Sequence, residues 1–323
     1  MSKREMYTIE LKAVPSDRFQ PTGFPDLGPA KFQKPVGDNG DWVDAILVES
    51  AQSMANRFEA VGWSEALQEP VATLRGLPWV KVVADDDGRY LTSSRTEAHR
   101  LASAFVKESV NLDGEDMVTS IRDTFDLSDD TPLATSRIAA AIFALDPLCL
   151  IHGVFFADKK WPGQPKFARA LTGFIEAVDV KEAYSGGVKR DDVRHSIGDG
   201  LGGSAEGYGH VPYHRTEYTA RKIELYVSID VGQFEAYGLS SEATKLLLAV
   251  ARWEVRSLLD HGLRLRTACE FEPLRDDGIA GLADAETLAS EIRTLIDGGF
   301  SGLADSDEEP MIVRWSGGKK RSG

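Results

Sequence analysis

Cysteine is scarce in this sequence, and long apolar runs are absent from it. The 323 residues include only two cysteines, Cys149 and Cys269, and neither belongs to a CxxC pair. The sequence therefore gives no support for a disulfide framework or a structural zinc site, and we expect no metal or other cofactor. No stretch approaches the ~18 consecutive apolar residues of a membrane-spanning helix. No apolar segment follows the basic residues near the N-terminus, so we expect a cytoplasmic protein that does not contact membranes.

Basic residues are outnumbered, but the imbalance is local. The net charge is −14. Between Glu270 and Glu309, twelve acidic residues face only Arg275 and Arg293, a local balance of −10, so the other residues together carry −4. An evenly acidic protein would be a poor nucleic-acid binder. Acidity near one end leaves room for a neutral or basic working surface elsewhere.

Hydrophobic periodicity is clearest between Val43 and Trp63, which we expect to form one amphipathic helix. Its apolar face carries Val43, Leu47, Met54, Phe58 and Val61. The opposite face and its flanks carry mostly amides and hydroxyls: Glu49, Ser50, Gln52, Ser53, Asn56 and Arg57. Short groups that donate and accept hydrogen bonds suit a sugar-phosphate backbone or another protein surface. The alternative is a solvated helix that is rich in serine and glutamine.

Two loops hold further candidate binding residues. The segment from Pro15 to Gly28 is fixed by three prolines and two glycines within it and carries Arg18, Phe19, Gln20 and Thr22. An arginine and aromatic rings in a rigid loop can clamp a phosphate and stack on a base, although the rings can equally hold the loop against the core. The stretch from Ser185 to Gly209 contains eight glycines. Its basic residues, and those that follow it, are Lys189, Arg190, Arg194, His195, His214 and Arg215.

The order of the main elements predicts an α+β fold. We expect strand, helix, strand, strand, helix, strand, the βαββαβ ferredoxin-like arrangement of RNA-recognition modules. The six elements are Met6–Val14, Val43–Trp63, Leu148–Phe156, Thr219–Asp230, Ser241–Leu259 and Leu263–Phe271. Outside this core we expect a hairpin at Leu77–Val83 and Tyr90–Ser93, helices at Thr135–Leu145 and Ala285–Ile296, and a strand at Met311–Trp315.

Four stretches resemble the backbone subunit of CRISPR Cascade complexes. They are Arg18–Gly28, Val48–Arg57, Ser94–Arg100 and Pro212–Glu217, and the likeness extends over most of the chain to about residue 260. The resemblance is to the type I-U branch, also called I-G, of the Cas-seven superfamily of RAMP proteins, the Csb-one branch. It implies an RRM-like palm over residues 1–271, helical fingers inserted at about 64–147, and a β-hairpin thumb at about 181–218. The resemblance does not cover the acidic segment 272–316, which we expect to pack on the palm, or residues 317–323, which we expect to form a disordered basic tail.

The resemblance also implies a function. Copies of the protein would line up along a CRISPR RNA, contact other Cascade subunits, and present the guide for pairing with target DNA, without cutting nucleic acid. No catalytic residue is expected. The residues expected to contact RNA are Arg18, Phe19, Gln20, Thr22, Ser50, Gln52, Ser53, Asn56, Arg57, Lys189, Arg190, Arg194, His195, His214 and Arg215.

Two other functions stay open at this point. An endoribonuclease could use His195, His214, Lys189 and Tyr213 as acid, base and charge stabiliser, or an aspartate at 191, 192 or 199. The pair His210 and His214 could suggest a metal, but no third ligand lies nearby in the sequence. An acidic scaffold, with the glycine-rich stretch as a plain linker, would bind no RNA.

Overall fold

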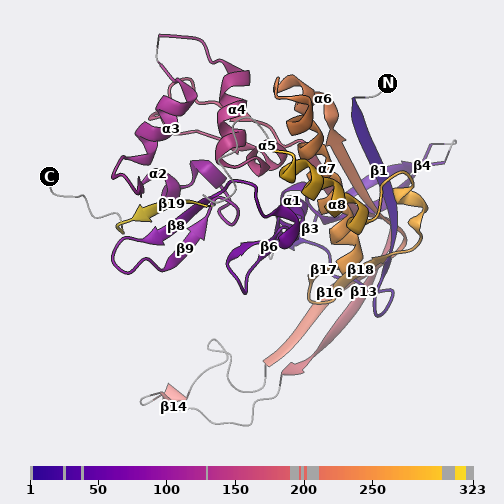
Figure 1. Ribbon diagram of the computed structural model, residues 1–323. Coiled ribbons are helices and arrows are strands. Elements are labelled where there is room, and N and C mark those ends of the chain that lie inside the picture. The colour runs from indigo at the N-terminus through magenta and orange to yellow at the C-terminus, as the bar shows by residue number, and fades with distance from the viewer. Residues whose placement is uncertain are drawn as a thin grey trace.

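The fold is mixed α+β, with one large sheet, one smaller sheet and helices packed against both (Figure 1). The computed structural model describes residues 3–24, 27–37, 40–128, 130–189, 196–197, 200–201, 211–299 and 310–317.

The large sheet has seven strands in the order β17-β18-β1-β16-β13-β5-β4. Every neighbouring pair is antiparallel. The strands are β1 (Arg4–Ala13), β4 (Lys31–Val36), β5 (Asp41–Glu49), β13 (Leu171–Lys189), β16 (Val211–Asp230), β17 (Leu263–Arg266) and β18 (Cys269–Pro273).

The two central strands are much longer than their neighbours. They pair from Leu171 opposite Ile229 to Lys189 opposite Val211. Strand β1 pairs with β16 only as far as Ile223, so the far halves of β13 and β16 leave the sheet as a two-stranded hairpin (Figure 1). Residues 185–189, the start of the stretch 185–209 that we treated as a loop, are therefore paired strand.

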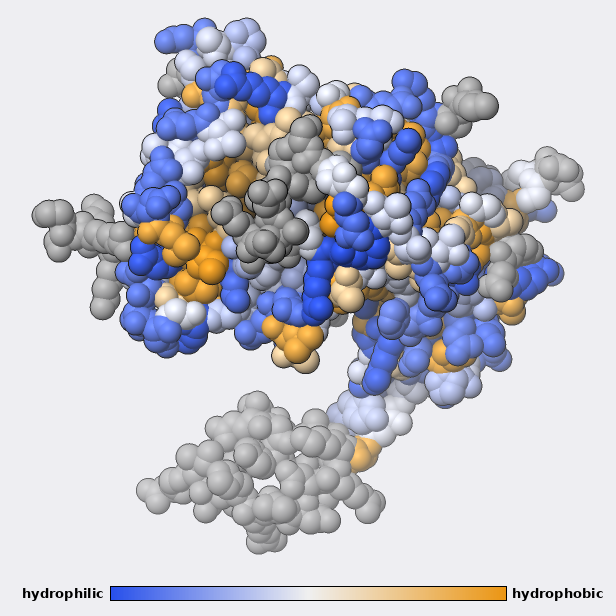
Figure 2. Space-filling view, viewed as in Figure 1, coloured by the Kyte–Doolittle hydropathy of each residue, from blue (hydrophilic) through white to orange (hydrophobic). Residues whose placement is uncertain are grey.

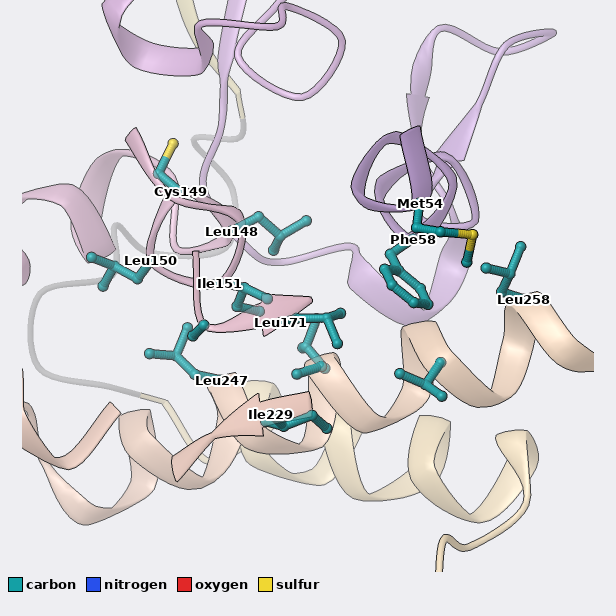
Figure 3. Packing of buried hydrophobic residues seen from close by; sticks show 14 of the residues in the cluster. Met54, Phe58, Leu148, Cys149, Leu150, Ile151, Leu171, Ile229, Leu247 and Leu258 are labelled. Carbon is teal, nitrogen blue, oxygen red and sulfur yellow. The ribbon is translucent and has the colours of Figure 1, made fainter. Parts of the chain in front are cut away.

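Helices α1 (Ala51–Ala60) and α7 (Ser241–His261) pack against each other and bury the core between themselves and the sheet. Met54 and Phe58 of α1 meet Leu258 of α7 in this core (Figure 3). Gly173 in β13 permits the approach of α1, because a Cβ there would lie 3.0 Å from the Phe58 ring.

Helix α7 follows the sequence signals closely. The Oγ of Ser240 accepts a hydrogen bond from the backbone N–H of Ala243 at 3.1 Å, as expected of an N-cap. The helix ends before Gly262, whose φ of +80° suits glycine.

The helix expected to start at Val43 is wrong in its first half. Residues Asp41–Glu49 form β5, which is paired on both sides by β4 and β13, and the helix begins at Ala51. Ser50 caps it through a hydrogen bond from the N–H of Ser53 to the Ser50 Oγ, at 3.3 Å. Pairing with strands that are distant in sequence determines the conformation of this segment.

The strand expected at Leu148–Phe156 is also wrong. It is helix α5 (Leu148–His152), followed by the short strand β11 (Val154–Phe155). The side chains of α5 join the same core (Figure 3), and a short run buried on all sides has no periodicity that separates helix from strand. Strand β13 takes the place that we assigned to this segment. The expected strand Leu263–Phe271 is in fact two strands, β17 and β18, joined by a turn.

Most of the inserted segment between α1 and β13 surrounds a second sheet, of four strands in the order β10-β19-β8-β9. The hairpin of β8 (Val80–Ala84) and β9 (Tyr90–Ser93) confirms the prediction. The same segment contains the helices α2 (Ala104–Lys107), α3 (Met117–Phe125) and α4 (Thr135–Leu145). The bounds of α4 are those that we predicted. Strand β10 is Val110–Asn111.

The acidic C-terminal segment divides between two places. Helix α8 (Ala285–Asp297) packs against α7, beside the large sheet. Strand β19 (Met311–Trp315) instead lies inside the four-stranded sheet, parallel to β8 and antiparallel to β10. The inserted segment therefore depends on the end of the chain for one of its two central strands.

The remaining elements are short. They are β2 (Gly23–Phe24), β3 (Gly28–Pro29), β6 (Trp63–Ser64), β7 (Glu69–Pro70), β12 (Lys166–Phe167), β14 (Ser196–Ile197), β15 (Gly200–Leu201), α6 (Val231–Ala236) and 3-10 turns at Ala72–Leu74, Arg100–Ala102 and Asp276–Ile279. The face seen in Figure 2 is mostly hydrophilic, with small separate hydrophobic patches. None of the helices within the described ranges is long and apolar enough to cross a membrane.

Candidate nucleic-acid interface

A groove of about 870 Å³ lies where the hairpin of β13 and β16 leaves the sheet. One wall consists of residues from 20–23 and 27–31, and the other is the base of the hairpin. The groove brings together four residues predicted from the sequence to contact RNA: Gln20, Thr22, His214 and Arg215. They come from distant parts of the chain and share this surface because the loop after β1 folds back against β16.

Backbone hydrogen bonds hold the loop in place. Phe19 and Tyr218 exchange both of their backbone hydrogen bonds, at 2.9 and 2.8 Å. The Thr22 N–H donates to the Val48 carbonyl at 3.0 Å, which ties the loop to the end of β5. The groove wall is therefore attached to the sheet on both sides of Pro21.

Phe19 requires a correction. Its ring is fully buried and packs against Phe271, with ring centroids 5.7 Å apart. A ring with no exposed surface cannot stack on a base, so Phe19 anchors the loop. Arg18 is half exposed, and its guanidinium lies 3.7 Å from the Glu217 carboxylate on β16.

A buried carboxylate connects this loop to helix α1. Glu49 is fully buried, and its carboxylate is paired with the guanidinium groups of Arg57 and Arg266 and accepts a hydrogen bond from the Ser53 hydroxyl. Arg266 also donates to the Gln20 carbonyl at 3.1 Å. One buried charge thus ties β5, α1, β17 and the groove wall together. Removing one partner of such a pair is far costlier than removing an exposed one.

The polar face of α1 therefore contains two kinds of residue: some bond within the protein, and others are exposed. Ser50, Ser53 and Arg57 are used within the protein, Arg57 also through a 2.6 Å hydrogen bond to the Leu265 carbonyl. Gln52 and Asn56 are exposed, one turn apart on the helix. Of the predicted set on α1, these two are the residues whose side chains are exposed to solvent.

Lys31 is a groove residue that the sequence analysis missed. Its Nζ lies 2.5 Å from the Glu182 Oε1 and 5.2 Å from the centroid of the Tyr218 ring. The hydrogen bond to Glu182 raises the pKa of Lys31 to about 12, so this cation stays charged at neutral pH. The only signal in the sequence is its position directly after the proline- and glycine-rich loop.

Three arginines without a carboxylate partner in the described part of the chain lie at the groove or beside α1. Most arginines in the described residues form ion pairs with carboxylates, and four do not: Arg122, Arg169, Arg215 and Arg264. Arg215 lines the groove. Arg169 donates to Gln52 at 3.1 Å, and the Arg264 carbonyl accepts from Arg57 at 3.4 Å. Three of the four therefore border the groove or α1.

The stretch Ser94–Arg100 has a structural role. Ser94 and Arg95 contact the buried Asp146 at 2.5 and 2.9 Å. Arg100 donates two hydrogen bonds to Glu59 of α1, each of 2.7 Å. The contacts of Arg100 fasten the inserted segment to α1, and those of Ser94 and Arg95 join it internally to the end of α4.

The far end of the hairpin lies outside the described residues. Of Lys189 the structure gives the backbone alone, opposite Val211. Arg190, Arg194 and His195 fall outside, as do His210 and the aspartates at 191, 192 and 199 that an endoribonuclease could use. Tyr213 is half exposed, and the Arg215 guanidinium lies 5.3 Å from its ring centroid. In the part of the chain that is described, no group of three or more His, Cys, Asp or Glu side chains could hold a metal ion.

The fold and the groove together define a mixed α+β protein with a polar, partly cationic surface at the base of a projecting hairpin. Residues 7–182, more than half of the chain, match the family model described as CRISPR-associated protein GSU0053, and the chain belongs to this family.

Two solved structures show a weak likeness. A chain of a structure titled "CRISPR RNA-guided surveillance complex, pre-nicking" is 13% identical, with 86% of this chain and 73% of that chain covered, at a TM-score of 0.36. Csc2 of Thermofilum pendens is 10% identical, with 95% and 80% covered, at a TM-score of 0.30. Neither likeness is strong enough to carry an argument about this chain. No curated protein matches it.

Proposed function

We propose that this protein is the guide-binding backbone subunit of a CRISPR surveillance complex of the type I-U/I-G branch. Several copies bind along one CRISPR RNA, contact the other subunits, and present the guide for pairing with target DNA. The observation that carries the proposal is the groove, in which Gln20, Thr22, Lys31, His214 and Arg215 meet in a chain of a CRISPR-associated family. The protein binds nucleic acid and does not cut it.

The strand order supports a palm of the RNA-recognition type. Strands β1, β13, β16 and β18, with α1 before β13 and α7 after β16, follow the βαββαβ order, and they lie in the sheet as β18-β1-β16-β13. The inserted segment then corresponds to the fingers, and the projecting hairpin to the thumb.

The chemistry of the groove favours the RNA backbone over the bases. Its donors are a permanently charged guanidinium, a charged ammonium, an amide and a hydroxyl, and these groups contact phosphate and sugar oxygens. Binding is therefore expected to depend strongly on salt and weakly on spacer sequence.

The test is the affinity of the full chain for single-stranded RNA, measured by fluorescence anisotropy at several salt concentrations. The double variant Lys31→Gln and Arg215→Gln removes both groove cations, and we expect a weaker salt dependence, with the slope reduced by roughly 0.7 per lost phosphate contact. Lys245→Gln is the control, because this exposed lysine lies on α7, away from the groove. Equal binding by the wild type and the double variant would place RNA outside the groove.

A further inference from the structure

Arg169 is a half-buried cation without a carboxylate partner. It lies two residues before β13, and its Nη2 donates to the Oε1 of Gln52 at 3.1 Å. Its Nε is buried and has no hydrogen-bond partner among the described residues. Buried guanidinium groups are ordinarily paired, because desolvation of an unpaired charge is costly.

The carboxylate of Glu59, which lies near Arg169, already binds another arginine. Both oxygens of Glu59 accept hydrogen bonds from Arg100, at 2.7 Å each, and Arg100 also donates to the Gly153 carbonyl. Burial lowers the pKa of Arg169, and the nearby positive charge of Arg100 lowers it further. An added anion would therefore relieve an unfavourable charge at Arg169.

Gln52 is oriented to assist in binding such an anion. Because its Oε1 accepts from Arg169, its amide N–H groups remain available as donors. Gln52 is exposed at the first turn of α1, and Asn56 follows on the same face. An arginine beside an outward-directed amide forms a donor surface that suits an oxyanion and repels a cation.

We infer that Arg169 and Gln52 form a phosphate-binding site for one phosphodiester group of single-stranded RNA. This inference rests on the proposed function. RNA is favoured because the first turn of α1, which carries Gln52, is joined to the groove wall through the end of β5. The Thr22 N–H on the groove wall bonds to Val48, two residues before the cap of α1. The Nη groups of the guanidinium donate to phosphate oxygens, while Gln52 donates to a further oxygen.

The first test compares Arg169→Gln with Arg169→Lys in the full chain, using oligouridine RNA and fluorescence anisotropy. Arg169→Gln is expected to weaken binding about tenfold and to reduce the salt slope by roughly 0.7, the value for one lost contact to a single strand. Arg169→Lys should retain part of the affinity, because it keeps the charge. Arg122→Gln is the matched control, since Arg122 also lacks an ion pair but lies on α3 in the inserted segment.

The second test uses Gln52→Glu. This change gives Arg169 the carboxylate that it lacks, so the free energy of unfolding should stay the same or rise. RNA affinity should nevertheless fall, because the new charge both occupies Arg169 and repels phosphate. A purely structural role for the pair would leave RNA affinity unchanged in this variant, and that result would overturn the inference. The variant also keeps the inference testable if Arg169→Gln fails to fold.

The outcomes separate the site from the function. If Arg169→Gln and Gln52→Glu bind RNA like the wild type while the groove double variant is impaired, the site is refuted and the proposed function stands. If the wild-type protein binds no RNA, the proposed function itself fails. Inorganic phosphate should raise the melting temperature of the wild type more than that of Arg169→Gln, and an equal rise would count against the site. Unchanged RNA affinity with loss of polyglutamate binding would assign the site to an acidic protein segment instead.

Discussion

Replacing Glu49 by glutamine is the sharpest perturbation of the framework behind the groove. The change keeps the volume of the side chain and removes a fully buried charge that pairs with Arg57 and Arg266. Breaking a buried pair costs 3–5 kcal/mol in comparable cases. The two arginine side chains are 26% and 27% exposed and can regain some hydration. We therefore expect a loss near the lower end, about 3 kcal/mol of unfolding free energy.

The assay is urea unfolding followed by tryptophan fluorescence. The control is Glu69→Gln, which breaks the ion pair with Arg75, whose side chains are 39% and 55% exposed, and which should cost less than about 1 kcal/mol. Because Arg266 also bonds to the Gln20 carbonyl, Glu49→Gln should weaken RNA binding as well. Equal effects of the two substitutions on stability would refute the idea that Glu49 ties the elements together.

Two further predictions concern parts of the fold away from the groove. Burial raises the pKa of Glu254 above its ordinary 4.5, opposite His152 at 3.0 Å, so the folded state retains a proton that the unfolded state releases. The stability that this raised pKa contributes is fully present below pH 4.5 and is lost as the pH rises through the pKa of the folded state. Glu254→Gln should therefore gain stability relative to the wild type as the pH rises above 4.5. Urea titrations at several pH values measure this difference, and a difference that does not change with pH would contradict the prediction. Val313→Asp places a charge at a fully buried position of β19 and should lower the melting temperature strongly. The control is Ile312→Asp at the neighbouring, partly exposed position, which should lower it far less. Equal shifts in melting temperature would mean that β19 does not support the sheet.

The sequence predicted those elements whose signals are local. The predicted helix Ser241–Leu259 matches α7, and the predicted strand Thr219–Asp230 is the second half of β16. The strand β5 could not be predicted in the same way. Its residues also fit a helical period, and they are extended because β4 and β13 pair with them from distant parts of the chain.

The site was predicted only in part, for a related reason. Gln20, Thr22, His214 and Arg215 were identified from composition and resemblance, and the fold brings them to one groove. Burial is a property of the tertiary structure, so the sequence left the role of Phe19 open between base stacking and core packing, and it did not show that Glu49 is buried. Arg169 belongs to no recognisable motif. Among the described residues it lacks a carboxylate partner because the fold pairs Glu59 with Arg100, and such a pairing cannot be predicted from the sequence.

The central claim is most directly tested by purifying the protein after co-expression with a CRISPR RNA and the other subunits. The measurement is the mass of the complex and its ratio of nucleic-acid to protein absorbance. We expect a particle with several copies of this protein on one protected RNA, and loss of that particle when residues 186–209 are replaced by a short Gly-Ser linker. Recovery of an RNA-free monomer from the wild-type chain under the same conditions would contradict the account.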